Sequence, residues 1–590
     1  MSFYFYRHQR ERLLKGILYL SFLILFIRFF QLQVLSGSVY KEWSDRNRVR
    51  QISVIANRGL IFDRTNRILV DNRPSYSLFI IPYEFEKNPE MVERISSITG
   101  LSGDEIENRI LQVENGLFIP VRIVRDMDFE TLSKVEEYRL DLPGVFYQYE
   151  PVRTYPLDVR ASHVIGYLSE INETELTMLI GSGYKKGDMI GKTGVEKRYD
   201  SVLRGERGYR YIEVDVHGRE VGNFNGKRDI EPVSGNNIKL SLDMDLQKLA
   251  EVLLDNQKGA IVVLNPQNGE VLSMVSKPDY NLEPFARGLS IKAWENLSGD
   301  PDKPLLNRTI QAQLPPGSTY KLIVAASALE DGLIDTNREI FCGGMFWLGT
   351  RMFPCWRSEG HGSVDILDAI QESCNVFFYQ LGLQVGIDRW VKYSRHLYFG
   401  AMTQVDLDGE SEGLLPDRRY LDEKYGEGGW SKGMVVNLSI GQGDLLVTPI
   451  QMAMLAAVIG MEGKYPTPHV VQAIQDRSGD WNEESVRIHR INGLSIAVYK
   501  LLKEGMSRVV NQSGGTGQGA WIPDVEVCGK TGTAQNPHGK EHAWFIGFAP
   551  RNDPKIAVAL VIENGGSGGS VAAPIAGEIM QLFFRKPVIL

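Results

Sequence analysis

The sequence from residue 315 to residue 326 reads PPGSTYKLIVAA. Two prolines and a glycine predict a turn, and the apolar run that follows has the character of a buried helix. Ser318 and Lys321 are three residues apart, so on a helix they share one face and the lysine amine comes within reach of the serine hydroxyl. A lysine buried at a helix start can have a lowered pKa and act as a base. This stretch predicts a serine nucleophile beside its base.

Two more motifs follow in the order that one known solution for acyl transfer requires. Such chemistry needs a nucleophile, a base and donors for the oxyanion. The solution in question uses Ser-x-x-Lys, then Ser-x-Asn, then Lys-Thr-Gly. Here Ser318-x-x-Lys321 is followed by Ser373-Cys374-Asn375 and by Lys530-Thr531-Gly532-Thr533.

The surroundings of the second and third motifs fit this reading. Ser373 lies between helical patterns at 364–370 and 376–383, so it can project from a turn into a cleft. Lys530 follows an extended run, which predicts a strand. A cationic strand edge with two threonine hydroxyls suits a carboxylate, and Gly532 would let a substrate backbone approach closely.

Each motif alone has an ordinary explanation. Ser373 and Asn375 could form a helix cap, and Lys530-Thr531-Gly532 could be a plain turn. Further copies occur in less suitable places: Ser-x-x-Lys at Ser38 and Ser182, Ser-x-Asn at Ser234 and Lys-Thr-Gly at Lys192. The ordered set favours catalysis over these alternatives.

The whole chain predicts a multidomain α+β protein. Its 590 residues are too many for one core, and 43% apolar with 23% charged residues is a globular mixture. A net charge of −8 gives no indication of a nucleic-acid partner.

The N-terminus predicts a membrane anchor. Residues 13–35 form a span long enough to cross a bilayer, interrupted only by Lys15 and Arg28. Basic residues precede it, so residues 1–12 should form a cytoplasmic tail and the rest should lie outside. A cleaved signal peptide and a buried core helix are the alternatives.

The remainder divides near residue 235. Residues 36–235 alternate short strand patterns, such as 77–81 and 209–216, with short helices, which predicts an extended, mostly-β pedestal without a nucleophile–base pair. Residues 236–590 begin with a strand, a helix capped by Asp243 and a hairpin at Asn268-Gly269. They end with strand patterns at 543–549 and 556–562, so we expect one sheet flanked by helices.

Three of the four cysteines fall close together. The pattern Cys342-x12-Cys355-x5-His361-x12-Cys374 offers a Cys₃His set, which is a common structural zinc composition. An oxidising compartment would instead favour a Cys342–Cys355 disulfide, and free thiols are the third possibility.

The chain resembles the class B penicillin-binding proteins over nearly its whole length. Asn66 stands where their first motif usually has glycine, and Asn also tolerates a left-handed backbone. Similar to the pedestal motifs are Arg58-Gly59-x-Ile61-x-Asp63-Arg64, Arg153-x-Tyr155-Pro156 with His163, and Gly191-x-x-Gly194-Val195-Glu196. Typical of the catalytic half are Gly441-Gln442-Gly443, Thr448-Pro449-x-Gln451 and Trp544-Phe545-x-Gly547-Phe548.

The resemblance implies a serine D,D-transpeptidase with a penicillin-binding, serine β-lactamase-like domain. Ser318 would attack the penultimate D-alanine carbonyl, with Lys321 as its base. Ser373 and Asn375 would relay protons and hold the acyl chain. Lys530, Thr531 and Thr533 would bind the terminal carboxylate, and the N–H groups of Ser318 and Thr533 would form the oxyanion hole.

The resemblance also implies a place and partners. The enzyme would be a single-pass protein of the bacterial cytoplasmic membrane, acting outside on peptidoglycan stem peptides and inhibited by β-lactams. Within the class the chain is similar to the elongation branch, penicillin-binding protein 2; the septal branch and a D,D-carboxypeptidase or β-lactam-sensing hydrolase are the alternatives. Elongation relatives imply a SEDS-family glycosyltransferase partner and a structural zinc on Cys342, Cys355, His361 and Cys374.

Overall fold

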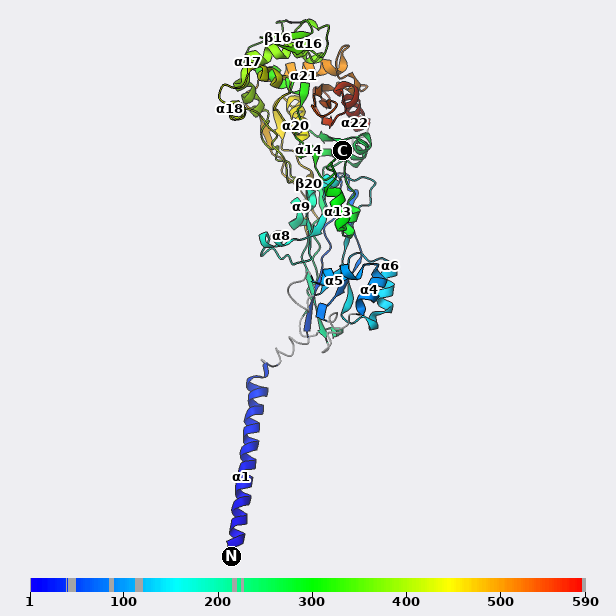
Figure 1. The fold of residues 1–590 in the computed structure, drawn as a ribbon, viewed down its shortest axis with the longest axis vertical. Coiled ribbons are helices and arrows are strands. Elements are labelled where there is room, and N and C mark those ends of the chain that lie inside the picture. The colour runs from blue at the N-terminus through cyan, green and yellow to red at the C-terminus, as the bar shows by residue number, and fades with distance from the viewer. Residues whose placement is uncertain are drawn as a thin grey trace. The chain divides into compact units, whose positions relative to one another are not determined.

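The computed structural model describes residues 2–38, 40, 49–83, 90–111, 120–214, 220–223 and 228–585 (Figure 1). Lys41 of the Ser38 motif, and residues 215 and 216 of a predicted strand, lie outside this set. The chain forms two compact units. One comprises 1–57, 74–151 and 205–234, and the other comprises 58–73, 152–204 and 235–590.

The N-terminal helix α1 spans Ser2–Phe30 and continues as the π-helical turn η1, Gln31–Leu35. From Arg10 to Leu35 it provides 26 residues, the one helix of the described chain that is long and apolar enough to cross a bilayer. Its large apolar side chains are exposed; Leu18, for example, is 55% exposed. An exposed apolar helix of this length supports the predicted single-pass anchor.

The first unit contains two three-stranded antiparallel sheets. The order of one is β1 (Val49–Val54), β10 (Gly208–Val214), β11 (Glu220–Asn223), and that of the other is β5 (Val121–Val124), β4 (Tyr76–Ile80), β6 (Val145–Tyr149). Helices α4 (Met91–Thr99), α5 (Gly103–Leu111) and α6 (Phe129–Glu137) share a small apolar core with the second sheet. The predicted strands at 77–81 and 209–216 are confirmed over their described residues.

The second unit begins with a six-stranded sheet assembled from distant segments. Its order is β21 (Trp481–Glu483), β20 (Val471–Gln475), β12 (Ile238–Leu240), β2 (Ile61–Phe62), β3 (Ile68–Arg73), β7 (Val152–Thr154). Asn66 lies in the β2–β3 turn with φ 65°, the left-handed conformation that the family motif usually assigns to glycine.

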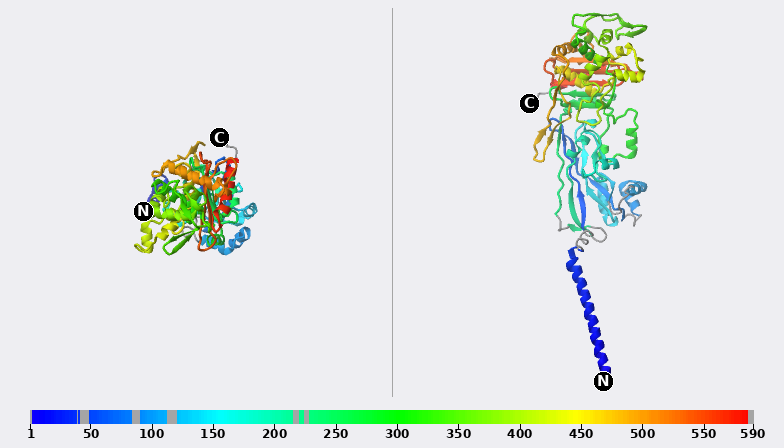
Figure 2. Two further views of the ribbon diagram at one scale, coloured as in Figure 1. Left: turned by 90° about the horizontal axis from the view of Figure 1, so that it is seen from above. Right: turned by 90° about the vertical axis from the view of Figure 1, so that its left-hand side faces the viewer.

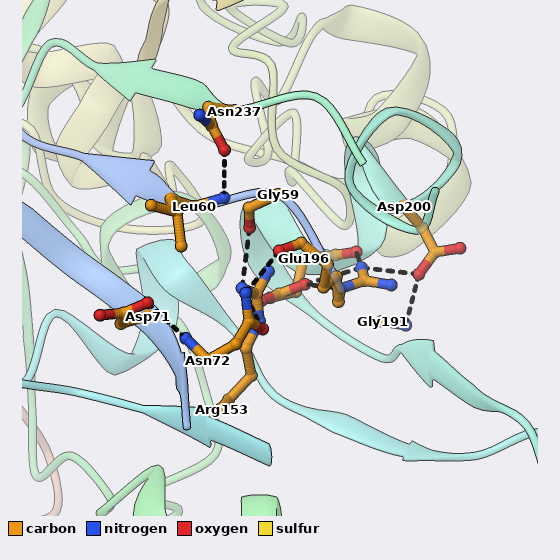
Figure 3. Close-up of polar contacts among 10 residues, drawn as sticks. Gly59, Leu60, Asp71, Asn72, Arg153, Gly191, Glu196, Asp200 and Asn237 are labelled. Carbon is orange, nitrogen blue, oxygen red and sulfur yellow. Dashed lines mark hydrogen bonds and ion pairs between the residues drawn. The ribbon is translucent and has the colours of Figure 1, made fainter. Parts of the chain in front are cut away.

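A buried ion cluster joins the three pedestal motifs in this unit (Figure 3). The Glu196 carboxylate accepts hydrogen bonds from Arg58 Nε at 2.7 Å and from Arg153 Nε at 2.9 Å. Asp200 accepts a second bond from Arg58, at 2.8 Å, and one from Gly191 N at 3.0 Å. Burial alone would raise the pKa of Glu196, but the two guanidinium groups hold it below its usual value.

The core of the second unit is a five-stranded antiparallel sheet. Its order is β14 (Val271–Lys277), β13 (Gly259–Leu264), β25 (Ile556–Ile562), β24 (His542–Ala549), β23 (Cys528–Ala534). Figure 2 shows the green early strands beside the orange and red late ones. Every residue of β13, β14, β24 and β25 is buried. A sheet with one wet face would alternate, so both faces must be covered.

Helices supply that cover. Helix α20 (Pro449–Gly460) is buried at every residue and packs on β13, β24 and β25. Thr448 and Gln451 close its N-terminus with a reciprocal capping box, and Pro449 takes the first position, which explains this sequence motif. Helices α11 (Met244–Leu253) and α22 (Ala573–Arg585) pack on each other and on the sheet, and Asp243 caps α11 as predicted.

A helical layer beside β23 carries the remaining motifs. Helices α16, α17 and α21 gather with strand β16 in Figure 1. The bounds are η3 Gly317–Tyr320, α15 Lys321–Glu330, β16 Met345–Leu348, β17 Arg351–Pro354, α16 Ile366–Gln371, α17 Asn375–His396 and α21 Ile496–Asn511. A sheet flanked by helices, with a mostly-β part and an apolar N-terminal helix, confirms the predicted fold class.

The ion cluster yields a stability prediction. Replacing Glu196 by Gln leaves two buried guanidinium groups with one carboxylate, so we expect the free energy of unfolding of the second unit to fall by about 3–5 kcal/mol. Urea unfolding followed by tryptophan fluorescence measures this. As a control, Glu423→Gln breaks an exposed ion pair with Arg419 and should leave the urea midpoint unchanged. Equal midpoints for Glu196→Gln and Glu423→Gln would contradict a stabilising role for the cluster.

Candidate active site

Ser318 lies on a tight turn that two other elements hold in place. Gly317 has φ 59°, and its N–H donates to Gly441 O at 2.9 Å. A Cβ built on Gly441 would lie 2.1 Å from Gly317 O, so only glycine permits this approach. From the sheet, Trp544 Nε1 donates to Pro315 O at 2.9 Å. The turn, Gly317–Tyr320, is 3₁₀ rather than α-helical, and the α-helix α15 begins at Lys321.

The Lys321 amine is fully buried and fixed by oxygens of the second motif. Its Nζ donates to Ser373 O at 2.7 Å, to Asn375 Oδ1 at 2.7 Å and to Ser373 Oγ at 3.3 Å. Burial lowers the pKa of Lys321 to about 8. A tenth or so of these amines are therefore neutral near pH 7 and able to accept a proton.

Lys530 approaches the same hydroxyl from strand β23. Its Nζ donates to Ser373 Oγ at 2.9 Å and to Thr531 O at 3.2 Å. Burial, and then repulsion from Lys321, lower the pKa of Lys530 well below its usual value. Among the described residues neither lysine has a carboxylate partner. Both amines depend on hydrogen bonds, and Lys321 Nζ also lies 5.5 Å from the centroid of the Phe378 ring.

Ser373 has a backbone conformation that is rare for residues other than glycine. Its φ is 56°, in the left-handed region, at the turn between α16 and α17. That conformation sends both its carbonyl and its hydroxyl to Lys321. Strained residues of this kind concentrate at functional sites because surrounding contacts hold them there.

The structure brings all five predicted catalytic residues together, with one difference in detail. Among the described hydrogen bonds none joins Ser318 Oγ to Lys321 Nζ, because Ser373 and Asn375 hold the amine. Ser318 itself is half-buried and lines the cleft. Ser318 is thus accessible to a ligand in the cleft, whereas the amine of its predicted base, Lys321, is buried beneath the cleft lining.

The third motif makes contacts that only partly follow the prediction. Thr531 Oγ1 donates to Thr516 Oγ1 at 2.8 Å, and Thr533 Oγ1 accepts from Gly568 N at 3.2 Å. Gly532 is expected to leave room for a substrate backbone. Instead the nearest atom to its missing Cβ is Pro316 O, at 2.8 Å. The absent side chain therefore makes room for the turn that carries Ser318.

A cleft of about 880 Å³ opens over Ser318. Sequence reasoning missed much of its lining. Thr516 could have been found from the glycine cluster around it, Gly514-Gly515-Thr516-Gly517. The lining residues of strand β17, such as Arg351 and Phe353, carry no comparable sequence signal. The missed lining residues include Arg351, Met352, Phe353, Trp356, Tyr379, Asn437, Thr516, Gln535, Glu541, Ser567 and Ser570.

The cysteine cluster closes near this cleft. The ligand atoms of Cys342, Cys355, His361 and Cys374 lie within 4.8 Å of one another. Both Cys342 Sγ and Cys355 Sγ lie 3.5 Å from His361 Nδ1. Zinc bond lengths of about 2.3 Å to sulfur and 2.0–2.1 Å to nitrogen give a tetrahedral S···N edge of roughly 3.6 Å, which these distances match. All four cysteines of the chain are unbridged, so the alternative Cys342–Cys355 disulfide is not formed.

Comparison with known proteins gives a family for each half of the chain. The penicillin binding protein transpeptidase domain matches residues 259–581, and the penicillin-binding protein dimerisation domain matches residues 53–240.

Curated relatives align along almost the whole chain. A peptidoglycan D,D-transpeptidase MrdA of Haemophilus influenzae is 31% identical, over 97% of this chain and 90% of its own length. The protein of the same name from Acinetobacter baumannii is 34% identical, over 94% and 85%.

Solved structures agree with these relatives. The complex of penicillin-binding protein 2 with MreC from Helicobacter pylori contains a chain with TM-score 0.80 and 30% identity, covering 91% of this chain and 100% of that one. The predicted family and enzyme class are confirmed by these matches. With a dimerisation domain ahead of a transpeptidase domain, the chain belongs to the class B penicillin-binding proteins, the serine D,D-transpeptidases of peptidoglycan synthesis.

Proposed function

We propose that this chain cross-links peptidoglycan during cell elongation through an acyl-enzyme on Ser318. The observation that carries the proposal is the convergence of Ser318, Lys321, Ser373, Asn375 and Lys530 beneath one cleft. The elongation role is supported by the names of the relatives, which are MrdA and penicillin-binding protein 2.

The donor stem peptide binds first. Its terminal carboxylate sits at the hydroxyls of Thr531 and Thr533, with Lys530 adding positive charge from below. This places the penultimate D-alanine carbonyl at Ser318. The N–H groups of Ser318 and Thr533 then receive the developing oxyanion, and each such donor contributes roughly 3–4 kcal/mol to the stabilisation of the transition state in other enzymes.

Acylation moves one proton and exchanges one bond. Neutral Lys321 takes the Ser318 proton as Oγ attacks the carbonyl carbon. The C–N bond to the last D-alanine breaks, and its nitrogen leaves as an amine after receiving a proton relayed through Ser373.

In the second half-reaction the neutral amine of a neighbouring stem peptide attacks the ester carbon. The C–O bond to Ser318 breaks, and the proton returns to Oγ. A β-lactam acylates the same serine.

The N-terminal helix indicates where the enzyme works in the cell. Helix α1 holds the chain in the cytoplasmic membrane, and the basic residues before the span keep its start inside. The catalytic unit then works outside, in the periplasm. We propose a SEDS-family glycosyltransferase as the membrane partner; a structure of a peptidoglycan synthase complex contains a chain 29% identical to this one, with TM-score 0.71, covering 98% of this chain and 99% of that one, which supports the proposal.

We further propose that Cys342, Cys355, His361 and Cys374 hold a structural Zn²⁺. The donor set, its burial and the S···N distances fit this ion. His361 Nε2 is buried and has no hydrogen-bond partner among the described residues; the Glu372 carboxylate, at 3.8 Å, is too far to donate or accept there. Because Cys374 stands between Ser373 and Asn375, the metal would fix the turn that holds the Lys321 amine.

Removal of the nucleophile tests the proposed function. The full-length protein in detergent is supplied with polymerised glycan that carries pentapeptide stems, and cross-linked fragments are counted after digestion. We expect Ser318→Ala to reduce cross-linking by at least a hundredfold, because no acyl-enzyme can form. Ser182→Ala changes the serine of an exposed Ser-x-x-Lys copy and should retain full activity. Wild-type cross-linking by Ser318→Ala would contradict the proposal.

Elemental analysis tests the metal. We expect one zinc per molecule in the wild type and in Cys528→Ser, whose cysteine lies outside the cluster. Cys342→Ser and His361→Ala should each retain little zinc and unfold at a lower temperature. Less than one zinc in ten wild-type molecules would overturn the metal proposal and leave the acyl-enzyme proposal standing.

A further inference from the structure

Glu541 is the one carboxylate residue of the described cleft lining. This side chain is exposed and lines the cleft together with Ser318 and Thr533. Its main-chain oxygen accepts from Gly566 N at 2.8 Å, but among the described residues its carboxylate has no hydrogen bond or ion pair. The other charged side chain of the described lining is Arg351, which lies on β17 with its guanidinium 5.0 Å from the Phe353 ring centroid.

Sheet register directs Glu541 toward the reacting groups. The ladder of β23 and β24 ends with Thr533 opposite Ala543 and Ala534 opposite His542, so Gln535 and Glu541 are the positions that immediately follow it. Side chains two residues apart on a strand, and side chains directly opposite, share a face. Continued by one pair, this register puts Gln535 and Glu541 on the face of Thr533, and all three side chains line the cleft.

The chemistry of the second half-reaction gives this position a role. The amine that resolves the acyl-enzyme must enter where the D-alanine amine left, by microscopic reversibility. The leaving D-alanine is held by its carboxylate at Thr531 and Thr533, so the acceptor approaches along the Thr533 side of the cleft. An amine in neutral water arrives as an ammonium ion, and a free carboxylate beside its path attracts it.

We propose that Glu541 is the acceptor-subsite residue that selects cationic amine acceptors over anionic ones. The inference rests on the proposed acyl-enzyme and adds the charge class of its second substrate. Glu541 attracts acceptors of positive net charge and repels those of negative net charge; the attacking amine loses a proton to water first, so the bonds made and broken at Ser318 are unchanged. Glu541 is a specificity residue, and the acylation step does not need it.

Exchange of the terminal D-alanine for added D-amino acids tests this. Donor pentapeptide is incubated with the full-length protein and D-lysine, D-norleucine or D-glutamate, acceptors that differ in side-chain charge. We expect wild-type kcat/KM to favour D-lysine over D-glutamate by roughly tenfold, with D-norleucine between them. Glu541→Gln should reduce the ratio to about twofold and Glu541→Lys should invert it. Added salt should bring the ratios of the wild type and of Glu541→Lys closer to one, from opposite sides.

Two controls separate the possible failures. Glu427→Gln removes an exposed carboxylate away from the cleft and should keep the wild-type ratio. Labelling by a fluorescent penicillin needs no amine acceptor, so it should proceed equally in the wild type and in all three variants. A Glu541→Gln ratio equal to that of the wild type, with labelling intact, would overturn the acceptor proposal alone, whereas loss of labelling in the wild type would overturn the acyl-enzyme on which it rests.

Discussion

The burial of two lysine amines against one serine hydroxyl is the constraint around which the catalytic unit is arranged. An ammonium ion in an apolar interior is costly, and a second one nearby raises the cost. Lys321 and Lys530 nevertheless converge on Ser373 Oγ, at 3.3 and 2.9 Å, without a carboxylate partner among the described residues. The cost is relieved when an amine loses its proton or when an anion binds above. The same arrangement is therefore suited to supply both a base and a carboxylate site.

Close backbone contacts keep this arrangement in register. Gly441 lets its loop reach Gly317, and Gly532 lets strand β23 reach Pro316, so the serine turn is held between two elements. Thr516 connects the third motif to the helix before the second motif. Its hydroxyl accepts a hydrogen bond from Thr531, and its N–H donates to Gln371 O, at the end of α16, at 3.3 Å. A Cys₃His cluster that includes Cys374 fits the same purpose, since it would fix Ser373 from the other side.

Periodicity and motif order predicted the strands and helices, and also the five candidate catalytic residues that the structure brings together, because these features are local. The alternation after Asn237, the Asp243 cap and the Ser-x-x-Lys spacing each act within a few residues. The cleft walls could not be predicted in this way, since Trp356, Thr516 and Glu541 meet only after distant segments pack. The compact units also required the structure. The ion cluster of Arg58, Arg153 and Glu196, whose partners are up to 138 residues apart, links residues 58–73 to 152–204, and pairing of β2 with β12 links residues 58–73 to the catalytic part of the same unit. The predicted division near residue 235 stays a prediction from composition.

The central claim is that the neutral Lys321 amine takes the proton from Ser318, and the pH dependence of acylation tests it most directly. The rate constant for labelling by a fluorescent penicillin should be measured from pH 6 to pH 9, with the adduct mapped to its peptide. Burial lowers the pKa of Lys321 to about 8, so the fraction of neutral amine increases as the pH rises toward 8. The account predicts a rate that rises about tenfold per pH unit up to pH 7.5 and levels off above pH 8.5. A rate that stays constant across this range would contradict it.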